Sequence, residues 1–466
     1  MKSLSIRGTL ASLSLSMLLS SLGTSIANVG LPTLAEAFSA SFQAVQWVVL
    51  AYLLSITALI VSVGRLGDLV GRRRLLLVGI AVFTVASILC ALAPNLWLLI
   101  AARALQGIGA ATMMALTMAL VSGAVPKEKM GSAMGVLGTM SAMGTSLGPT
   151  LGGVLIAQMG WQGIFLLNVP LGVLAMGLAW CCLPVDRRET TASRPGFDRL
   201  GTLVLVLTLL AYALAMTLGR GSFGPLNTAL LLVAVIGLIL FVFVEQTAAS
   251  PLVNLAMLRN PLLSSGFAMS TLVTTVVMAT LVVGPFYLSG ALGLSAARVG
   301  LVMSAGPLVA ALAGMPCGRL VDRWGAQRSS AVGLMAMLTG ASILAAVPMS
   351  VGVPGYLIAL VVLTAGYALF QAANNTAVMA DIAPQQRGVV SGLLGLSRNL
   401  GLITGASVMG AVFAFGTGSH DILLAQPEAI AQGMRLTFAV TAGLILVALV
   451  MGAISKIVSR RLIAPY

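Results

Sequence analysis

The chain has 466 residues, of which 59% are hydrophobic and 8% are charged, and its mean hydropathy is +1.07. Soluble globular proteins of ordinary composition do not reach such values, so the composition indicates an integral membrane protein. The net charge of +14 does not indicate nucleic-acid binding, because the basic residues lie in short loops between apolar runs rather than in one stripe or tail.

The apolar runs are about 20 residues long, the length that an α-helix needs to cross about 30 Å of hydrocarbon. We therefore predict an all-α membrane protein with fourteen spans. With this layout nearly all loop Lys and Arg residues fall on one side, so the positive-inside rule predicts that both termini are cytoplasmic. The predicted spans are 8–30, 43–63, 75–94, 97–122, 131–156, 163–184, 200–218, 227–245, 263–289, 297–317, 329–348, 355–380, 389–415 and 435–456.

Two similar charged segments indicate an internal repeat. Residues 64–74 read GRLGDLVGRRR, and residues 318–325 read GRLVDRWG. Each follows the second predicted span of its half. We predict two pseudo-symmetric six-helix halves, 1–184 and 262–466, joined through a cytoplasmic linker with an inserted two-helix hairpin at 185–261. Parallel six-helix repeats with a central site are a known transporter architecture.

Several motifs, in the right order, carry a family resemblance. Residues 64–74 resemble the motif between helices two and three of the major facilitator superfamily. Residues 103–110 (RALQGIGA) resemble its helix-four motif, and residues 144–153 (GTSLGPTLGG) its helix-five exporter motif. Residues 161–165 and 168–170, with the inserted hairpin, are similar to the fourteen-span drug:proton antiporter branch. The resemblance implies a major-facilitator-type bundle that works by alternating access.

By this resemblance the first charged segment is a conformational gate. Asp68 is flanked by arginines, so its carboxylate can form ion pairs and lie near the positive end of a helix dipole. Gly64, Gly67 and Gly71 predict a tight turn at this point. The alternative is that the arginines only fix the topology. The gating candidates are Gly64, Arg65, Asp68, Gly71, Arg72 and Arg73, with Asp322 and Arg323 as a weaker copy in the second half.

Two arginines lie inside predicted spans, where an ionised side chain is costly unless it is paired or hydrated. We predict that Arg103 and Arg398 couple to proton movement or to substrate charge. The alternative for Arg103 is a snorkelling anchor near the membrane surface. The antiporter branch usually carries an acidic residue where this chain has Gly23, and no carboxylate lies in the middle of a predicted span. The intramembrane charge is therefore net positive.

Polar and methionine side chains within the spans are candidates for lining a substrate cavity. The alternatives are hydrogen bonds between helices and apolar filling. The candidates are Asn28, Gln106, Met114, Gln371, Asn374 and Asn375.

The helix-five motif contains glycines four residues apart, which let a neighbouring helix approach closely, and a proline that bends the span. We expect this close contact to join the two halves. The motif residues are Gly144, Gly148, Pro149, Gly152 and Gly153.

We predict a proton-coupled efflux transporter for hydrophobic drugs or related small molecules in the bacterial inner membrane. Its partners are a small-molecule substrate, protons and membrane lipids, and we expect a functional monomer without a cofactor, metal or nucleic acid. The alternative, favoured by Gly23 and the two arginines, is an exporter of an anionic or neutral metabolite on the same fold. A membrane-embedded enzyme would need clustered acid–base residues, whereas the chain offers one histidine, His420, and no acidic pair.

Overall fold

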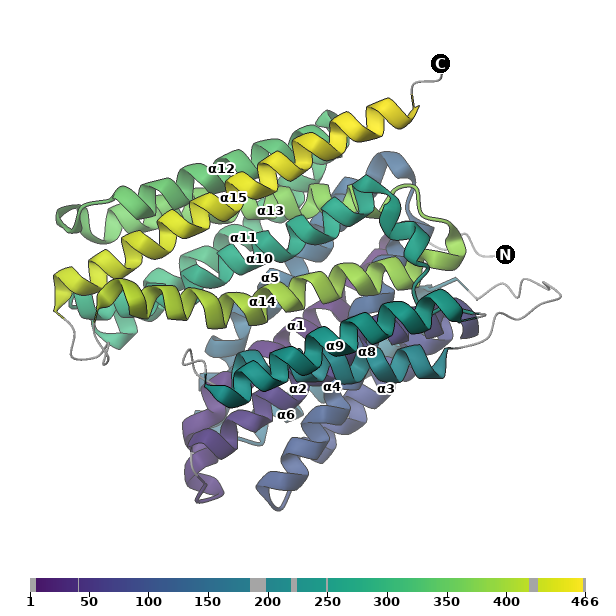
Figure 1. Ribbon diagram of the computed structural model, residues 1–466. Helices are drawn as coiled ribbons and strands as arrows, with labels where there is room; N and C mark the ends of the chain where they lie inside the picture. The colour runs from purple at the N-terminus through teal and green to yellow at the C-terminus, as the bar shows by residue number, and fades with distance from the viewer. Residues whose placement is uncertain are drawn as a thin grey trace. The chain divides into compact units, whose positions relative to one another are not determined.

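A computed structural model describes residues 6–40, 42–184, 198–218, 224–248, 250–418 and 426–463. In these ranges every regular element is helical (Figure 1). The all-α prediction is therefore confirmed. Residues 185–197 of the predicted linker and His420 lie outside the described ranges.

Each predicted span coincides with a helix, and the sixth is divided between α6 and α7. Thirteen helical segments among the described residues are long and apolar enough to cross a membrane. The predicted span that is not among these thirteen is the fifth, 131–156, which coincides with α5 and is rich in Gly, Ser and Thr. The N-terminal helices are α1 (Ile6–Ala37), α2 (Phe42–Val70), α3 (Arg72–Ala91), α4 (Leu96–Ala124), α5 (Met130–Met159), α6 (Gly163–Leu166) and α7 (Asn168–Cys182). The inserted pair is α8 (Arg199–Thr217) and α9 (Pro225–Thr247), and the C-terminal helices are α10 (Pro261–Phe286), α11 (Ala296–Trp324), α12 (Ala326–Ala346), α13 (Gly352–Met379), α14 (Arg387–Thr417) and α15 (Pro427–Ile463).

Contacts divide the chain into two compact units. Unit 1 comprises residues 1–210, 237–253 and 379–396, and unit 2 comprises the rest. The beginning of α14 thus packs within unit 1, although it lies far along the chain. The sequence-based division at 184 and 262 stays a prediction.

In unit 1, α1 packs along α5, and α4 packs against both α2 and α3. In unit 2, α15 packs against α10 and α12 (Figure 1). The core of unit 2 contains the stacked rings of Tyr287 and Tyr356, with centroids 6.0 Å apart. Each unit therefore has its own buried core.

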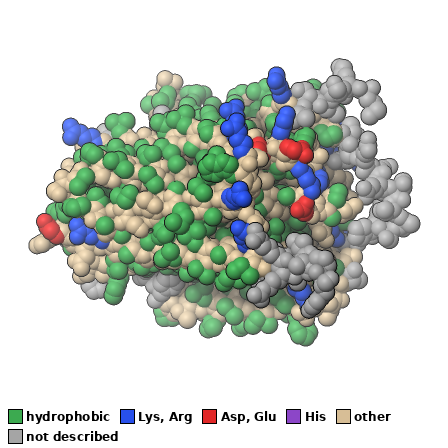
Figure 2. Space-filling model, turned by 90° about the horizontal axis from the view of Figure 1, so that it is seen from above, with side chains coloured by type: hydrophobic (Ala, Val, Ile, Leu, Met, Phe, Trp, Pro, Cys, Tyr) green, Lys and Arg blue, Asp and Glu red, His purple; other side chains and the backbone are tan. Residues whose placement is uncertain are grey.

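The outward faces of the helices are apolar. In α9, for example, Ile236, Ile239 and Phe243 are all exposed. Figure 2 shows a face covered largely by hydrophobic side chains, with Lys and Arg gathered in patches. Extended apolar surface with charge confined to patches is what a lipid-facing protein presents.

The first charged segment is not a loop. Helix α2 continues through Gly64 and Gly67 to Val70, and α3 begins at Arg72, so the turn is made by Gly71 alone, with φ of +113°. The prediction that Gly64 and Gly67 form the tight turn was wrong, because both lie in α2. The second charged segment behaves alike: α11 runs on to Trp324, and the turn is made by Gly325, with φ of +81°.

Candidate functional site

The Asp68 carboxylate lies at the N-terminus of α14. Its Oδ1 accepts hydrogen bonds from Arg72 Nε (3.0 Å) and Nη2 (2.9 Å) and from the Gly388 backbone N–H (2.9 Å). Its Oδ2 accepts from the Val389 N–H at 3.1 Å. The side chain is only 1% exposed. A helix N-terminus offers unpaired N–H groups and a partial positive charge, so it binds a carboxylate well.

Close glycine contacts bring α2 and α14 together at this point. A Cβ at Gly64 would overlap the carbonyl oxygen of Gly388, so neither helix tolerates a side chain there. Gly392, one turn further along α14, would meet the Ile60 carbonyl oxygen at 2.7 Å. The glycine of the charged segment thus serves close approach between helices rather than a turn.

Further bonds hold the beginning of α14 in unit 1. Arg72 Nη2 donates to the Pro384 carbonyl, and Ser391 Oγ donates to the Ala115 carbonyl of α4. We call Asp68, Arg72, Gly388, Val389 and the glycine contact the α2–α14 latch.

The other gating candidates lie outside this latch. Arg73 Nη2 donates to the Trp180 carbonyl at 2.6 Å and lies over the Trp180 ring at 5.5 Å. Asp322 is half-buried in the last turn of α11, and Arg323 beside it is exposed. Exposed Lys127 and Asp381 form a surface ion pair at 2.7 Å.

Arg103 is completely buried in unit 1. Its Nε donates to the Val48 carbonyl of α2 at 2.8 Å, its Nη2 to the Gly23 carbonyl of α1 at 3.1 Å, and its Nη1 to Gln106 Oε1. The guanidinium also lies over the Tyr52 ring at 4.2 Å. A snorkelling anchor would hold its charge at the membrane surface, whereas this charge joins three helices inside the unit.

Gln106 extends this network, because its Nε2 donates to Ser87 Oγ of α3 at 2.7 Å. Arg103 is therefore satisfied by carbonyl groups and a ring face.

The Tyr52 phenol and the Phe83 ring occupy the space beside Gly23. A Cβ at Gly23 would lie 2.8 Å from the Tyr52 hydroxyl oxygen and 3.3 Å from the Phe83 ring. The Tyr52 hydroxyl donates to the Ser20 carbonyl at 2.7 Å. The phenol thus fills the space that an acidic side chain would need.

In unit 2, Arg398 of α14 meets Gln371 of α13. In the amide orientation that satisfies both side chains, the Gln371 side-chain oxygen faces Arg398. It accepts hydrogen bonds from Arg398 Nε at 3.2 Å and Nη1 at 3.1 Å. Asn374, one turn along α13, donates through Nδ2 to the Gly266 carbonyl of α10 at 3.0 Å. Arg398 is half-buried, so its charge is more accessible than that of Arg103.

The remaining cavity candidates are scattered. Met114 and Asn375 are buried, whereas Asn28 is exposed. Gln106 and Asn374 both make hydrogen bonds within the protein, as the alternative of contacts between helices requires.

The helix-five glycines form a tight contact, but with α1. A Cβ at Gly144 would lie 2.6 Å from the Leu18 carbonyl oxygen, and one at Gly148 would lie 2.9 Å from the Ile26 nitrogen. Because α1 belongs to the same half, the expected contact between halves was wrong for these two glycines. Gly152 is buried, and a Cβ at Gly153 would meet nothing within 4 Å. The backbone of Pro149 continues α5 without interruption.

Sequence reasoning missed an acidic pair. Glu245 near the end of α9 and Asp198 before α8 both direct a carboxylate oxygen toward Gly201. The statement that the chain has no acidic pair was therefore wrong, because the hairpin brings together residues that are 47 positions apart. Among the described residues, no group of three or more His, Cys, Asp or Glu side chains could hold a metal ion.

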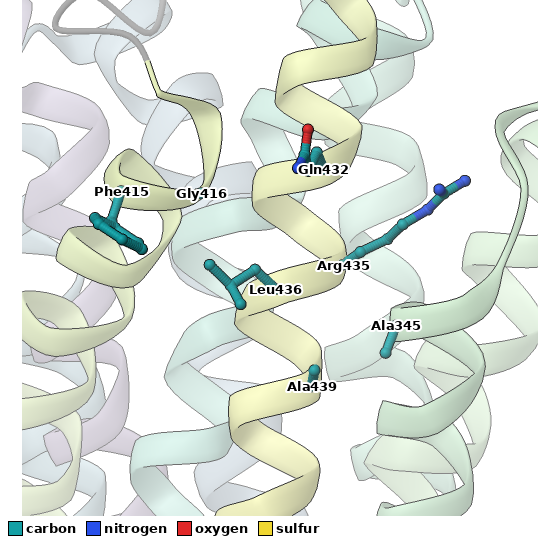
Figure 3. Close-up of a pocket in the computed structure, with 7 residues that line it drawn as sticks. All are labelled: Ala345, Phe415, Gly416, Gln432, Arg435, Leu436 and Ala439. Atoms are coloured by element: carbon teal, nitrogen blue, oxygen red, sulfur yellow. The ribbon is translucent and has the colours of Figure 1, made fainter.

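A pocket in unit 2 lies where α14 ends and α15 begins (Figure 3). The Arg435 side chain extends from α15 toward the end of α12 that carries Ala345, and Phe415 lies on α14. The lining contains none of the residues predicted for the site. It is made by Ala345, Phe415, Gly416, Gln432, Arg435, Leu436 and Ala439.

A family model described as Major Facilitator Superfamily matches residues 13–406 and, a second time, residues 263–463. Among curated proteins, the uncharacterized transporter YebQ of Escherichia coli is 33% identical over 88% of this chain and 92% of its own. The riboflavin transporter RibZ of Clostridioides difficile is 31% identical over 85% of this chain and 86% of its own. The drug efflux pump JefA of Mycobacterium tuberculosis is 34% identical over 84% of this chain and 78% of its own.

Solved structures show the same fold. The human organic anion transporter MFSD10 superposes with a TM-score of 0.67 at 17% identity, covering 96% of this chain and 99% of that one. The proton:xylose symporter XylE has a TM-score of 0.67 at 14% identity, covering 96% and 94%.

Proposed function

The chain belongs to the Major Facilitator Superfamily and is a multi-pass membrane transporter rather than an enzyme. On that premise we propose that it exports hydrophobic drugs or related small molecules in exchange for protons. It does so in the bacterial inner membrane as a monomer, with both termini in the cytoplasm and lipid around its apolar helices. Each proton that crosses 100 mV releases about 2.3 kcal/mol, which is enough to drive accumulation of a solute outside the cell.

The α2–α14 latch is the observation that carries this proposal. It joins a helix of the N-terminal half of the sequence to one of the C-terminal half through a buried carboxylate with four hydrogen bonds. Charge-assisted hydrogen bonds are stronger than neutral ones, so a latch built from them can hold one of the two conformations that a gate requires. Alternating access follows if the latch closes one side of the protein and opens when that side must admit substrate.

Export as the direction is supported by a relative. JefA, which is named a drug efflux pump, is 34% identical to this chain.

A second candidate is export of an anionic or neutral metabolite. Arg103 in unit 1 and Arg398 in unit 2 each place a positive charge among the helices of their own unit, and Tyr52 fills the space beside Gly23. A positive interior favours anions and disfavours lipophilic cations. RibZ, which is named a riboflavin transporter, is 31% identical to this chain.

Everted membrane vesicles with an imposed proton gradient distinguish the two candidates. Cationic, neutral and anionic compounds are added in turn while a pH-sensitive dye reports proton release, and vesicles without the protein are the control. Discharge of the gradient by lipophilic cations supports multidrug export. Discharge by anions or neutral compounds alone supports the second candidate, and no discharge by any compound refutes proton exchange.

A further inference from the structure

The inserted hairpin carries two carboxylates that face each other across a glycine. Helices α8 and α9 lie side by side (Figure 1), and Gly237 of α9 touches Thr208 of α8. A Cβ at Gly201 would lie 2.6 Å from Glu245 Oε1 and even closer to Asp198 Oδ2. The two oxygens are therefore no more than about 5 Å apart, a distance at which like charges repel strongly.

Each carboxylate has one oxygen in use and one without a partner. Asp198 Oδ1 accepts from the Gly201 N–H at 2.8 Å, and Glu245 Oε2 accepts from the Val253 N–H at 3.1 Å. Asp198 Oδ2 and Glu245 Oε1 are both buried and have no hydrogen-bond partner among the described residues. Glu245 is only 4% exposed. At this separation two ionised carboxylates repel each other, and a proton on one of these buried oxygens removes the repulsion and supplies a donor.

One cation stands near this pair. Arg65 of α2 is close enough for its positive charge to act on Glu245, and its Nε is buried without a partner among the described residues. The other groups that act on Glu245 are Asp198 and the backbone N–H groups of residues 252 and 253. Arg199 beside Asp198 is exposed. Among the described residues, the half-buried Arg65 is the cation that acts on Glu245, and its charge balances one of the two negative charges.

We propose that Asp198 and Glu245 form a proton-binding site in which one proton is shared between Asp198 Oδ2 and Glu245 Oε1. When the proton leaves to water, two carboxylates face Arg65. Carboxyl pairs that share one proton in this way titrate as a unit.

The site stands beside the latch. Arg65 and Asp68 are three residues apart on α2, so their side chains lie on one face of that helix. Loss of the proton strengthens the pull of the pair on Arg65, one turn from the Asp68 carboxylate, and so couples protonation to the latch. This coupling rests on the proposed transport function, whereas proton binding by the pair does not.

The first test is the thermal unfolding midpoint of the full-length protein in detergent, measured between about pH 5 and pH 9. Glu245→Gln keeps an oxygen for the Val253 N–H and presents an N–H to Asp198, so it imitates the protonated pair at every pH. We expect the wild-type midpoint to fall relative to that of Glu245→Gln as pH rises, because the wild-type pair loses its proton. Asp198→Asn is expected to behave as Glu245→Gln does.

Glu428→Gln is the matched control, because Glu428 is an exposed carboxylate on α15. Its midpoint is expected to follow the wild type at all pH values. A difference between wild type and Glu245→Gln that stays constant with pH overturns the proposal. Infrared spectra of the wild type need no variant: a protonated-carboxyl band that disappears as pH rises supports the site, and its absence at every pH overturns it.

Proton-driven export in proteoliposomes separates the site from the proposed function. We expect Glu245→Gln to lose the dependence of export on the proton gradient. Undiminished proton-driven export by Glu245→Gln overturns the coupling while the transport proposal stands. If the wild type shows no proton-driven transport but keeps the pH-dependent midpoint, the transport proposal fails and the proton site stands.

Discussion

Asp68→Asn is the substitution that tests the latch most directly. Asparagine keeps one oxygen, which can still accept hydrogen bonds, but it replaces the other oxygen with an amide that donates. Either Arg72 and the Gly388 N–H, which share Oδ1, or the Val389 N–H on Oδ2 then face a donor instead of an acceptor. The substitution also removes the negative charge at the N-terminus of α14.

The structure sets the size of the effect. Asp68 is 1% exposed and Arg72 16%, so water replaces few of the lost bonds. Removing one partner of a buried, hydrogen-bonded charge pair costs about 3–5 kcal/mol. Because about 1.4 kcal/mol is a factor of ten, the ratio of latched to unlatched protein should fall by about 10²–10³-fold. Proton-driven export should fall while expression stays normal.

Alkylation of a cysteine introduced beside the latch measures the ratio of latched to unlatched protein. Ser391 is completely buried against the Ala115 carbonyl, so Ser391→Cys, in a background without the native cysteines, reacts with N-ethylmaleimide only when the latch opens. We expect the rate to rise about 10²-fold in Asp68→Asn. Asp381→Asn is the control, because exposed ion pairs such as Lys127–Asp381 contribute about 0–1 kcal/mol. Equal rates in the two variants would refute the latch.

Three further predictions test the rest of the site. Arg103→Ala removes the donor that joins carbonyls of α1 and α2 to α4 and leaves a buried cavity. It should lower the free energy of unfolding by about 3–5 kcal/mol, measured by thermal unfolding, with loss of proton-driven export. Arg103→Lys should recover only part of the stability, because an ammonium lacks the planar fork. Gly148→Ala inserts a methyl against α1 and should cost about 1–3 kcal/mol, whereas Gly153→Ala, which meets nothing, should stay within about 0.5 kcal/mol of the wild type in the same assay. Arg398→Gln should raise the KM for an anionic substrate in vesicle transport and leave the KM for a neutral one unchanged, and equal effects on both would remove Arg398 from charge recognition.

The sequence alone predicted the helices well, because a span of about 20 apolar residues leaves the backbone no alternative to a helix. All predicted spans coincide with helices. The sequence predicted less well which residues make the turns in the charged segments. Gly64 and Gly67 look like turn residues in the sequence, yet they lie within α2, where the missing side chains admit Gly388 and Leu116. Glycine permits both uses, and only the neighbouring helix shows which applies.

The partners of the polar side chains could not be predicted, since they come from helices far apart in the sequence. The arginine of α4 is recognisable as an intramembrane charge, but its acceptors are backbone carbonyls at Val48 and Gly23, which every sequence contains. Asp198 and Glu245 each look like a solvated residue at the end of a helix. Only the closing of the α8–α9 hairpin makes them a pair.

The Arg103 network beside Gly23 and the carboxylate pair of the inserted hairpin differ in whether they can bind a proton. Beside Gly23, the Tyr52 hydroxyl leaves no room for an acid, and Arg103 finds its acceptors in backbone carbonyls and Gln106. A carbonyl oxygen does not take up a proton at physiological pH, so this network cannot load and release one as a carboxylate does. The proton exchange that we propose therefore needs an ionisable group elsewhere in the chain. The described residues place two facing carboxylates with unpaired oxygens at the end of the inserted hairpin, beside the arginine that precedes Asp68 on α2.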